Sequence, residues 1–255
     1  MRKGIYTFLD DLRAIRELTD VSLTTNGVLL SQNAERIQAA GIKRINISLD
    51  TLQREKFAYI TGYDVFDQVW EGIETAHALG FDPIKLNVVA LKGYNDDEFV
   101  DLAKLSLKYP FHIRFIEYMP IGNPQMRNRD YILAPDIKAA LSPLGELAPV
   151  ARRGTDGPAE RYRIPGAVGE IGFIPAMSHH FCQTCNRLRL TANGHLRPCL
   201  LSDKQLDLKG PMRSGCSDED IKAVFIEAVK SKHESHHFSP GSPFGVHDPM
   251  SGIGG

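Results

Sequence analysis

The sequence has few cysteines, little net charge and no long hydrophobic run. Its net charge is −1 over 255 residues, so no overall basic field indicates a nucleic-acid partner. The longest apolar runs, such as residues 86–91, are far too short to span a bilayer. Internal repeats and low-complexity segments are also absent. Hydrophobic residues make up 42% of the chain and charged residues 24%, which is typical of an ordinary globular protein. A chain of this length can bury a sizeable core.

The four cysteines are clustered rather than spread along the chain. All of them lie between Cys182 and Cys216. The first residues lead into an amphipathic segment containing Asp10 and Asp11 rather than into the apolar core of a signal peptide. Clustered cysteines without a secretory signal favour metal ligation in a reducing compartment over a disulfide framework. We therefore expect a cytoplasmic protein without a membrane partner.

The first half of the chain alternates strand and helix patterns. The apolar, β-rich runs predict strands at residues 21–25, 44–49, 84–91 and 112–119. Apolar residues at i, i+3 and i+4 predict helices at residues 7–16, 31–40, 66–79 and 96–108. Gly41, Gly80 and Pro110 separate the last three helices from the strands that follow them. Alternating strands and helices predict an α/β fold with parallel strands and right-handed crossovers.

Polar side chains recur where the predicted strands end. Thr24, Ser48, Asp50, Lys92 and Glu117 occupy these positions. Any one of them can simply cap the helix that follows. In parallel α/β folds, however, ligands bind at the carboxyl ends of the strands. The set as a whole therefore indicates a binding site.

The pattern changes after about residue 129. Short strands are expected at residues 162–164, 171–174 and 187–190, with helices at 135–141 and 218–231. The dipeptide Asn193-Gly194 predicts a hairpin turn after the last of these strands. We therefore expect two regions, an α/β part at residues 1–129 and a C-terminal part at residues 130–255.

Three cysteines have the spacing of a metal site. Cys182 and Cys185 form a C-x2-C pair, and the predicted hairpin returns Cys199 to the same centre. Three thiolates without an obvious fourth suit a four-iron cluster with one iron open to a ligand. Zinc is the alternative, with Cys216 or His195 as the fourth ligand. A thiol-redox pair is disfavoured because this C-x2-C opens a strand rather than a helix.

Arg187 and Arg189 follow the cysteine pair and alternate along a predicted strand, which places both on one face. Two neighbouring guanidiniums offer forked donors that match phosphate oxygens. A solvated strand face is the simpler interpretation of such a pair. Their position directly beside the metal ligands instead favours an anion-binding site.

Several motifs occur in one order along the chain: Thr24-Thr25-Asn26-Gly27, the residues 46–50, 114–119 and 182–189, and Gly254-Gly255. Together they resemble the molybdenum cofactor biosynthesis protein A family, the GTP 3′,8-cyclases, within the radical SAM enzymes. The resemblance covers essentially all 255 residues, and its most specific parts are the cysteine–arginine block and the terminal glycines.

The resemblance implies a fold, a reaction and partners. The fold is an incomplete parallel (β/α) radical SAM barrel with a C-terminal iron–sulfur appendage. One [4Fe-4S] cluster cleaves S-adenosylmethionine, and the second, on the appendage, holds GTP. The reaction converts GTP to (8S)-3′,8-cyclo-7,8-dihydroguanosine 5′-triphosphate for molybdenum cofactor biosynthesis. The implied pathway partner is the downstream cyclic pyranopterin monophosphate synthase, and a homodimer is a further expectation.

The resemblance also assigns residues. Cys182, Cys185 and Cys199 are expected to hold the substrate-binding cluster. The residues expected to contact GTP are Thr24, Lys85, Arg187, Arg189 and the main chain of Leu188. Ser48 and Met119 are expected to line the S-adenosylmethionine site.

The sequence departs from the family pattern in one respect. The family's C-x3-C-x2-C motif and its first two strands are not among these residues, so we expect an N-terminally truncated barrel. Two other functions are open at this point: a catalytically inactive, GTP-binding iron–sulfur module, or a zinc-stabilised interaction domain.

Overall fold

The computed structural model describes residues 3–119, 121–122, 131–151, 157–179, 182–232 and 246–253. Gly254 and Gly255, the expected terminal motif, lie outside these residues. The chain forms two compact units, which we call the sheet unit and the cysteine unit. The sheet unit comprises Met1–Glu117 and Ile132–Ile174, and the cysteine unit comprises Tyr118–Tyr131 and Pro175–Gly255.

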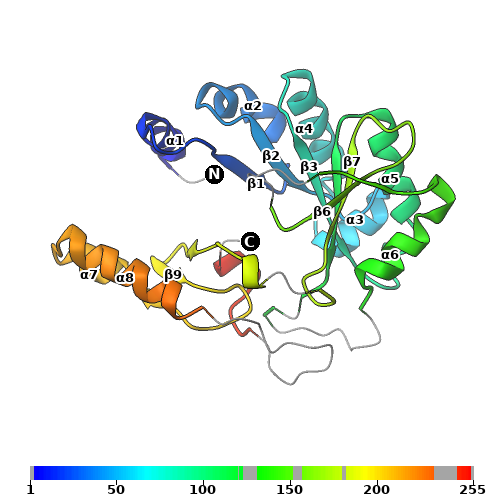
Figure 1. Cartoon of the computed structure of the whole chain (residues 1–255). Coiled ribbons are helices and arrows are strands. Elements are labelled where there is room, and N and C mark those ends of the chain that lie inside the picture. Colours follow the sequence, from blue (N-terminus) through cyan, green and yellow to red (C-terminus); the bar gives the residue numbers. More distant parts are fainter. Residues whose placement is uncertain are drawn as a thin grey trace. The chain divides into compact units, whose positions relative to one another are not determined.

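The sheet unit contains a seven-stranded sheet, drawn in Figure 1. Its strands, in spatial order, are β1 (Ser22–Thr25), β2 (Arg44–Ser48), β3 (Ile84–Ala90), β4 (His112–Glu117), β7 (Glu170–Ile174), β6 (Glu160–Arg163) and β5 (Ala148–Pro149). The first five in this order are parallel to one another, β6 is antiparallel to β7, and β5 is antiparallel to β6. The prediction of an α/β fold with a mainly parallel sheet is confirmed.

Except for α3, the helices of the sheet unit begin and end close to the predicted residues. They are α1 (Ile5–Ala14), α2 (Leu30–Ala39), α3 (Arg54–Thr61), α4 (Phe66–Ala78), α5 (Phe99–Lys108) and α6 (Ala134–Ala140). The glycine after α2 has the left-handed conformation that favours glycine, with φ 90° at Gly41, and its N–H donates to Gln38 O at 2.9 Å. The sequence did not predict α3, whose apolar face is weak and buries one residue, Phe57.

Alternation along the central strands gives the sheet two different faces. Ile45 and Ile47 on β2, Leu86 on β3 and Ile113 on β4 are fully buried in the core to which the helices contribute. Burying these side chains stabilises the sheet unit by roughly 1.5–3 kcal/mol each. The residues between them are largely polar and half-buried, as is typical of the opposite face of a pleated strand. This polar face carries the candidate site.

The boundary expected between residues 129 and 130 differs from the structure. After α6 the chain returns to the sheet, and β7 pairs in parallel with β4 over five registered residues. β6 and β5 then extend the same sheet. The short strands predicted near residues 162–164 and 171–174 therefore belong to the first unit, because their hydrogen-bond partners lie in that sheet.

The described part of the cysteine unit contains a small antiparallel sheet and two α-helices. The strands are β8 (Arg189–Leu190), β9 (His195–Arg197) and β10 (Leu206–Asp207), and the helices are α7 (Lys209–Arg213) and α8 (Asp218–Lys230). The predicted hairpin is present: Gly194 has φ 90°, and its N–H donates to Thr191 O at 2.9 Å. No helix in the described parts of the chain is both long and apolar enough to cross a membrane.

Candidate functional site

Strand register aligns polar side chains in a row across the sheet. Thr24 lies opposite Asn46, Asn46 opposite Lys85, Lys85 opposite His112, and His112 opposite Glu170. Two residues predicted to contact GTP, Thr24 and Lys85, thus share one row on one face. The structure adds Asn46, His112 and Glu170 to this row.

A second row lies two residues further along each parallel strand. It contains Ser48, Asn87, Arg114, Gly172 and Arg161. Ser48, predicted to line the S-adenosylmethionine site, is exposed at the end of β2. Beside it, Asn87 Oδ1 is buried and has no hydrogen-bond partner among the described residues. A buried acceptor of this kind is costly unless a ligand donor satisfies it, which fits a small-molecule site at Ser48.

A hydrogen-bond relay links the two rows. Arg114 Nη1 donates to Asn46 Oδ1 at 3.0 Å, and Asn46 Nδ2 donates to Thr24 Oγ1 at 3.3 Å. The amide of Asn46 is therefore oriented by the guanidinium. Because Thr24 Oγ1 accepts in this relay, its own proton can be donated to a ligand oxygen.

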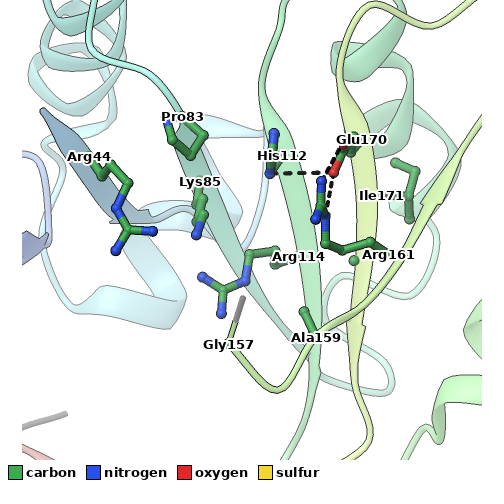
Figure 2. A pocket seen from close by; sticks show the side chains of 11 residues that line it. Arg44, Pro83, Lys85, His112, Arg114, Gly157, Ala159, Arg161, Glu170 and Ile171 are labelled. Carbon is green, nitrogen blue, oxygen red and sulfur yellow. Dashed lines mark hydrogen bonds and ion pairs between the residues drawn. The ribbon is translucent and has the colours of Figure 1, made fainter. Parts of the chain in front are cut away.

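The polar face encloses a cavity of about 150 Å³ (Figure 2). Among the described lining residues, four are permanent cations and one is a carboxylate, that of Glu170; the cations are Arg44, Lys85, Arg114 and Arg161. Arg44, Lys85 and His112 stand at or next to the first residues of β2, β3 and β4. The cavity thus lies toward the amino ends of these strands, whereas the sequence argument placed ligands at the carboxyl ends. A lining with this charge excess favours a polyanion.

Glu170 is tied to the arginines of β6. Arg161 donates to it through Nε at 2.7 Å and Nη2 at 2.9 Å, and Arg163 Nη2 donates at 3.2 Å. Burial alone would raise the pKa of Glu170. The hydrogen bonds from Arg161 and the charges of His112, Arg161 and Arg163 outweigh burial and bring this pKa below its ordinary value. The carboxylate is therefore ionised and fixes the guanidinium of Arg161 in the cavity wall.

Asp50 is a second perturbed carboxyl in the sheet unit. Burial raises its pKa from 3.8 to about 6, although the Val89 N–H donates to Oδ1 at 2.8 Å and partly opposes the shift. The buried Asn95 joins the same loops, because its Nδ2 donates to Asp50 O at 2.7 Å and to Val89 O at 2.8 Å. These contacts hold the carboxyl ends of β2 and β3 together beside Ser48.

The three cysteines that were predicted to hold a cluster are free thiols. Cys199 is close enough to Cys182 and Cys185 for their charges to shift its pKa. Cys182 and Cys185 belong to one tight turn, in which the Cys185 N–H donates to Cys182 O at 3.1 Å. Burial raises the pKa of Cys199, and the nearby Cys182 and Cys185 sulfurs raise it further. A cation would reverse this effect, because it stabilises the thiolates.

The arrangement of these thiols bears on which metal group they suit. Among the described residues, no three His, Cys, Asp or Glu side chains form a group that could hold a metal ion. One tetrahedral zinc would draw its sulfurs to within about 4 Å of each other. A four-iron cluster holds each thiolate at a different iron, so the sulfurs lie farther apart. Three clustered thiols are the donor set of a four-iron cluster with one open iron, whereas a structural zinc site would need a fourth ligand.

Arg187 and Arg189 are half-buried beside these cysteines, although β8 contains only the second of them. Burial lowers the pKa of both, and for Arg189 the charge of Arg187 lowers it further. Two desolvated guanidiniums that repel each other favour an anionic ligand. The intervening Leu188 is also half-buried.

Two cationic residues that the sequence argument did not select also contact this site. Lys232 Nζ donates to Arg187 O at 2.7 Å and approaches Cys185 Sγ at 3.7 Å. The fully buried Arg197 donates through Nε to Cys199 O at 3.3 Å and binds Asp248 Oδ2 at 2.8 Å. Met119 belongs to the cysteine unit, is half-buried, and accepts the Ile121 N–H at 2.8 Å.

The residues that sequence reasoning missed share one signal. They are polar residues at alternate positions of strands whose intervening residues are apolar: Asn46 on β2, Asn87 on β3, and His112 and Arg114 on β4. This alternation indicates a polar sheet face, but only the register between strands shows which of these residues meet.

Comparison with known proteins defines the class. Residues 1–106 match the radical SAM superfamily, and residues 111–238 match the family described as Molybdenum Cofactor Synthesis C. A GTP 3′,8-cyclase from Moorella thermoacetica is 46% identical over 94% of this chain and 75% of its own length. Those of Heliobacterium modesticaldum and Pelotomaculum thermopropionicum are 47% and 43% identical, over 73% and 78% of their own lengths.

The mainly parallel α/β sheet and the superfamily match define a radical SAM protein. Within that class, the chain belongs to the GTP 3′,8-cyclase family.

Proposed function

We propose that the cationic cavity of the sheet unit binds the triphosphate of GTP, and that the chain serves the GTP 3′,8-cyclase reaction of molybdenum cofactor biosynthesis. The observation that supports this most strongly is the described part of the cavity wall, which contains four cations, Arg44, Lys85, Arg114 and Arg161, and one carboxylate. A triphosphate has the charge and the forked oxygens that such a wall matches. Lys85, predicted from the family motif, lies in this wall.

The relay beside the cavity supports the same assignment. Arg114 orients Asn46, which in turn holds Thr24 as an acceptor with its proton available for a phosphate or ribose oxygen. A site whose side chains are fixed before binding loses less conformational entropy when the ligand arrives. We therefore propose Thr24, Asn46, Lys85 and Arg114 as GTP contacts of the sheet unit.

The cysteine unit has its own proposed contacts. Cys182, Cys185 and Cys199 are proposed to hold a [4Fe-4S] cluster, and Arg187, Arg189 and the main chain of Leu188 to contact GTP. The desolvation of both arginines supports an anionic ligand there. Lys232 and Arg197 would fix the main chain on either side of the cluster through Arg187 O and Cys199 O.

We propose that Ser48 and Met119 contact S-adenosylmethionine, and that Asn87 lies beside Ser48 in this site. The chemistry that this cofactor and its own four-iron cluster supply in the family is generation of the 5′-deoxyadenosyl radical. The unsatisfied Asn87 Oδ1 fits this assignment, because the amino groups of S-adenosylmethionine are hydrogen-bond donors. We further propose that the sheet is part of a (β/α) barrel.

Family membership also carries proposals about partners and place. They are delivery of the product to cyclic pyranopterin monophosphate synthase, a homodimer, and a cytoplasmic location, which the free cysteines support.

Binding of GTP to matched lysine variants tests the proposed site. Lys85→Met removes a cation from the cavity wall, and Lys104→Met makes the same change on the exposed surface of α5, where Lys104 pairs only with Asp101 among its described contacts. Losing a hydrogen bond to a charged group costs about 1.5–3 kcal/mol, or roughly 10- to 150-fold in Kd.

Isothermal titration under anaerobic conditions should show this loss for Lys85→Met and less than about a twofold change for Lys104→Met. Equal affinities for GTP in all three proteins would overturn the assignment of the triphosphate to this cavity.

A further inference from the structure

His112 is a lining residue of the cavity to which no role has been assigned. It is the first residue of β4 and lies in register between Lys85 on β3 and Glu170 on β7 (Figure 2). Its side chain is 21% exposed, and its Nδ1 is 3.7 Å from Glu170 Oε2. That separation exceeds hydrogen-bond length, so the imidazole is near a carboxylate without being held by it.

Charges on every neighbouring element act on this imidazole. Burial is the largest influence and lowers the pKa of His112. Glu170 on β7 and Asp82 before β3 raise the pKa, whereas Lys85 on β3 and Arg161 on β6 lower it, and the net pKa is below its ordinary value. Arg44 and Arg114 add further positive charge to the same cavity. Without a ligand, the ring is therefore neutral at pH 7.

A polyanion in the cavity would change this balance. Its charge opposes that of Lys85 and Arg161, the two neighbours that disfavour a protonated ring. Glu170 stays ionised because Arg161 and Arg163 hold it, so a carboxylate remains behind the ring in both states. An anion in front and a carboxylate behind both stabilise an imidazolium.

We propose that His112 contacts the polyphosphate of the substrate and takes up one proton from solvent when that polyphosphate binds, with Glu170 as the positioning residue behind it. This inference rests on the proposed binding of a triphosphate in the same cavity. No bond other than N–H forms or breaks. Binding should therefore strengthen as pH falls through the range in which the free ring is neutral.

Proton uptake during GTP binding tests the proposal. Titration calorimetry of the full chain at pH 7.5 in buffers of different ionisation enthalpy gives the number of protons taken up per GTP. His112→Gln keeps a polar side chain of similar reach but cannot titrate. His247→Gln, at an exposed position of the cysteine unit, is the matched control. Protons that GTP itself gains or loses on binding contribute equally to the count for wild type and for each variant, so they cancel when the proteins are compared.

Wild type and His247→Gln should take up more protons than His112→Gln, by a difference approaching one per GTP. As pH falls, the affinity of wild type and His247→Gln for GTP should also rise more steeply than that of His112→Gln, by up to about an additional tenfold per pH unit. Glu170→Gln should take up fewer protons than wild type, because it removes the carboxylate behind the ring. Labelled histidine spectra of the wild type provide a second measurement: the resonance missing from His112→Gln should titrate at higher pH when GTP is bound.

The experiment distinguishes failure of the proposed GTP site from failure of the role proposed for His112. If GTP binds neither wild type nor variant, the proposed function is wrong. If GTP binds and the proton count is the same with and without His112, the inference about His112 is overturned while the GTP site stands. An unchanged titration of His112 on GTP binding would overturn it as well.

Discussion

Replacing the partly buried Asp50 by Asn should stabilise the sheet unit at neutral pH. Burial raises the pKa of Asp50 to about 6 in the folded chain, against about 3.9 for an unfolded aspartate. The folded state therefore binds a proton more tightly than the unfolded state between these two values. Stability falls as pH rises from about 4 to about 6 and stays reduced above that range. Two pKa units correspond to about 3 kcal/mol of this loss.

The change Asp50→Asn removes the buried charge and keeps an oxygen that can accept the Val89 N–H, now at 2.8 Å. The variant should match the wild type near pH 4 and exceed its unfolding free energy by up to about 3 kcal/mol at pH 7. Urea unfolding at several pH values measures this difference. Trp70 is the single tryptophan and lies on α4, so its fluorescence reports on the sheet unit.

Asp101→Asn, at an exposed position of α5, serves as the control and should change stability by less than about 0.5 kcal/mol. A destabilised Asp50→Asn variant at pH 7 would refute the reasoning, because it would mean that ionised Asp50 is stabilised by its surroundings. An equal difference between the two proteins at pH 4 and pH 7 would also refute the reasoning, because the effect would then not depend on ionisation of Asp50.

Three further predictions concern the cysteines, the arginines and a glycine. Alanine at any one of Cys182, Cys185 or Cys199 should remove the iron and sulfide of anaerobically purified protein, whereas Cys216→Ala should keep them; stoichiometric zinc in place of iron would contradict this. Arg187→Ala and Arg189→Ala should each weaken GTP binding by about 1–3 kcal/mol and leave guanosine binding almost unchanged, and equal losses for both ligands would argue against a phosphate role. Gly169→Ala should lower the unfolding free energy by at least about 2 kcal/mol, because its Cβ would meet Tyr109 O at 2.7 Å and approach Phe111 O still more closely; a normal melting temperature would contradict this packing.

The central parallel strands could be predicted because their sequences alternate strongly and their helices end at clear breakers. Each of the strands β1 to β4 begins and ends within two residues of its predicted bounds, and α2 ends just before Gly41, as the sequence indicates. The position of β7 could not be predicted. Its five residues are all buried, a pattern that does not distinguish a strand of the main sheet from one of an appended domain. Only its hydrogen bonds to β4 place it in the first unit.

The candidate site was predictable in part. Thr24 and Lys85 were expected from the family motif, and the structure brings them into one row. Asn46 could not be assigned a role from the sequence, because its role depends on Arg114, which is 68 residues further along the chain. Glu170 was missed for the same reason: its function follows from Arg161 and His112 on other strands, and strand register cannot be read from one sequence.

At the cationic cavity, the phosphates rather than the guanosine should provide the binding energy. Anaerobic titration of one preparation with guanosine, GMP, GDP and GTP measures this. Lined by Lys85, Arg114 and their neighbours, the cavity should bind the series with Kd falling at each added phosphate, by at least about tenfold between GMP and GTP, and this gain should shrink as salt is raised. Guanosine binding as tightly as GTP would contradict the account.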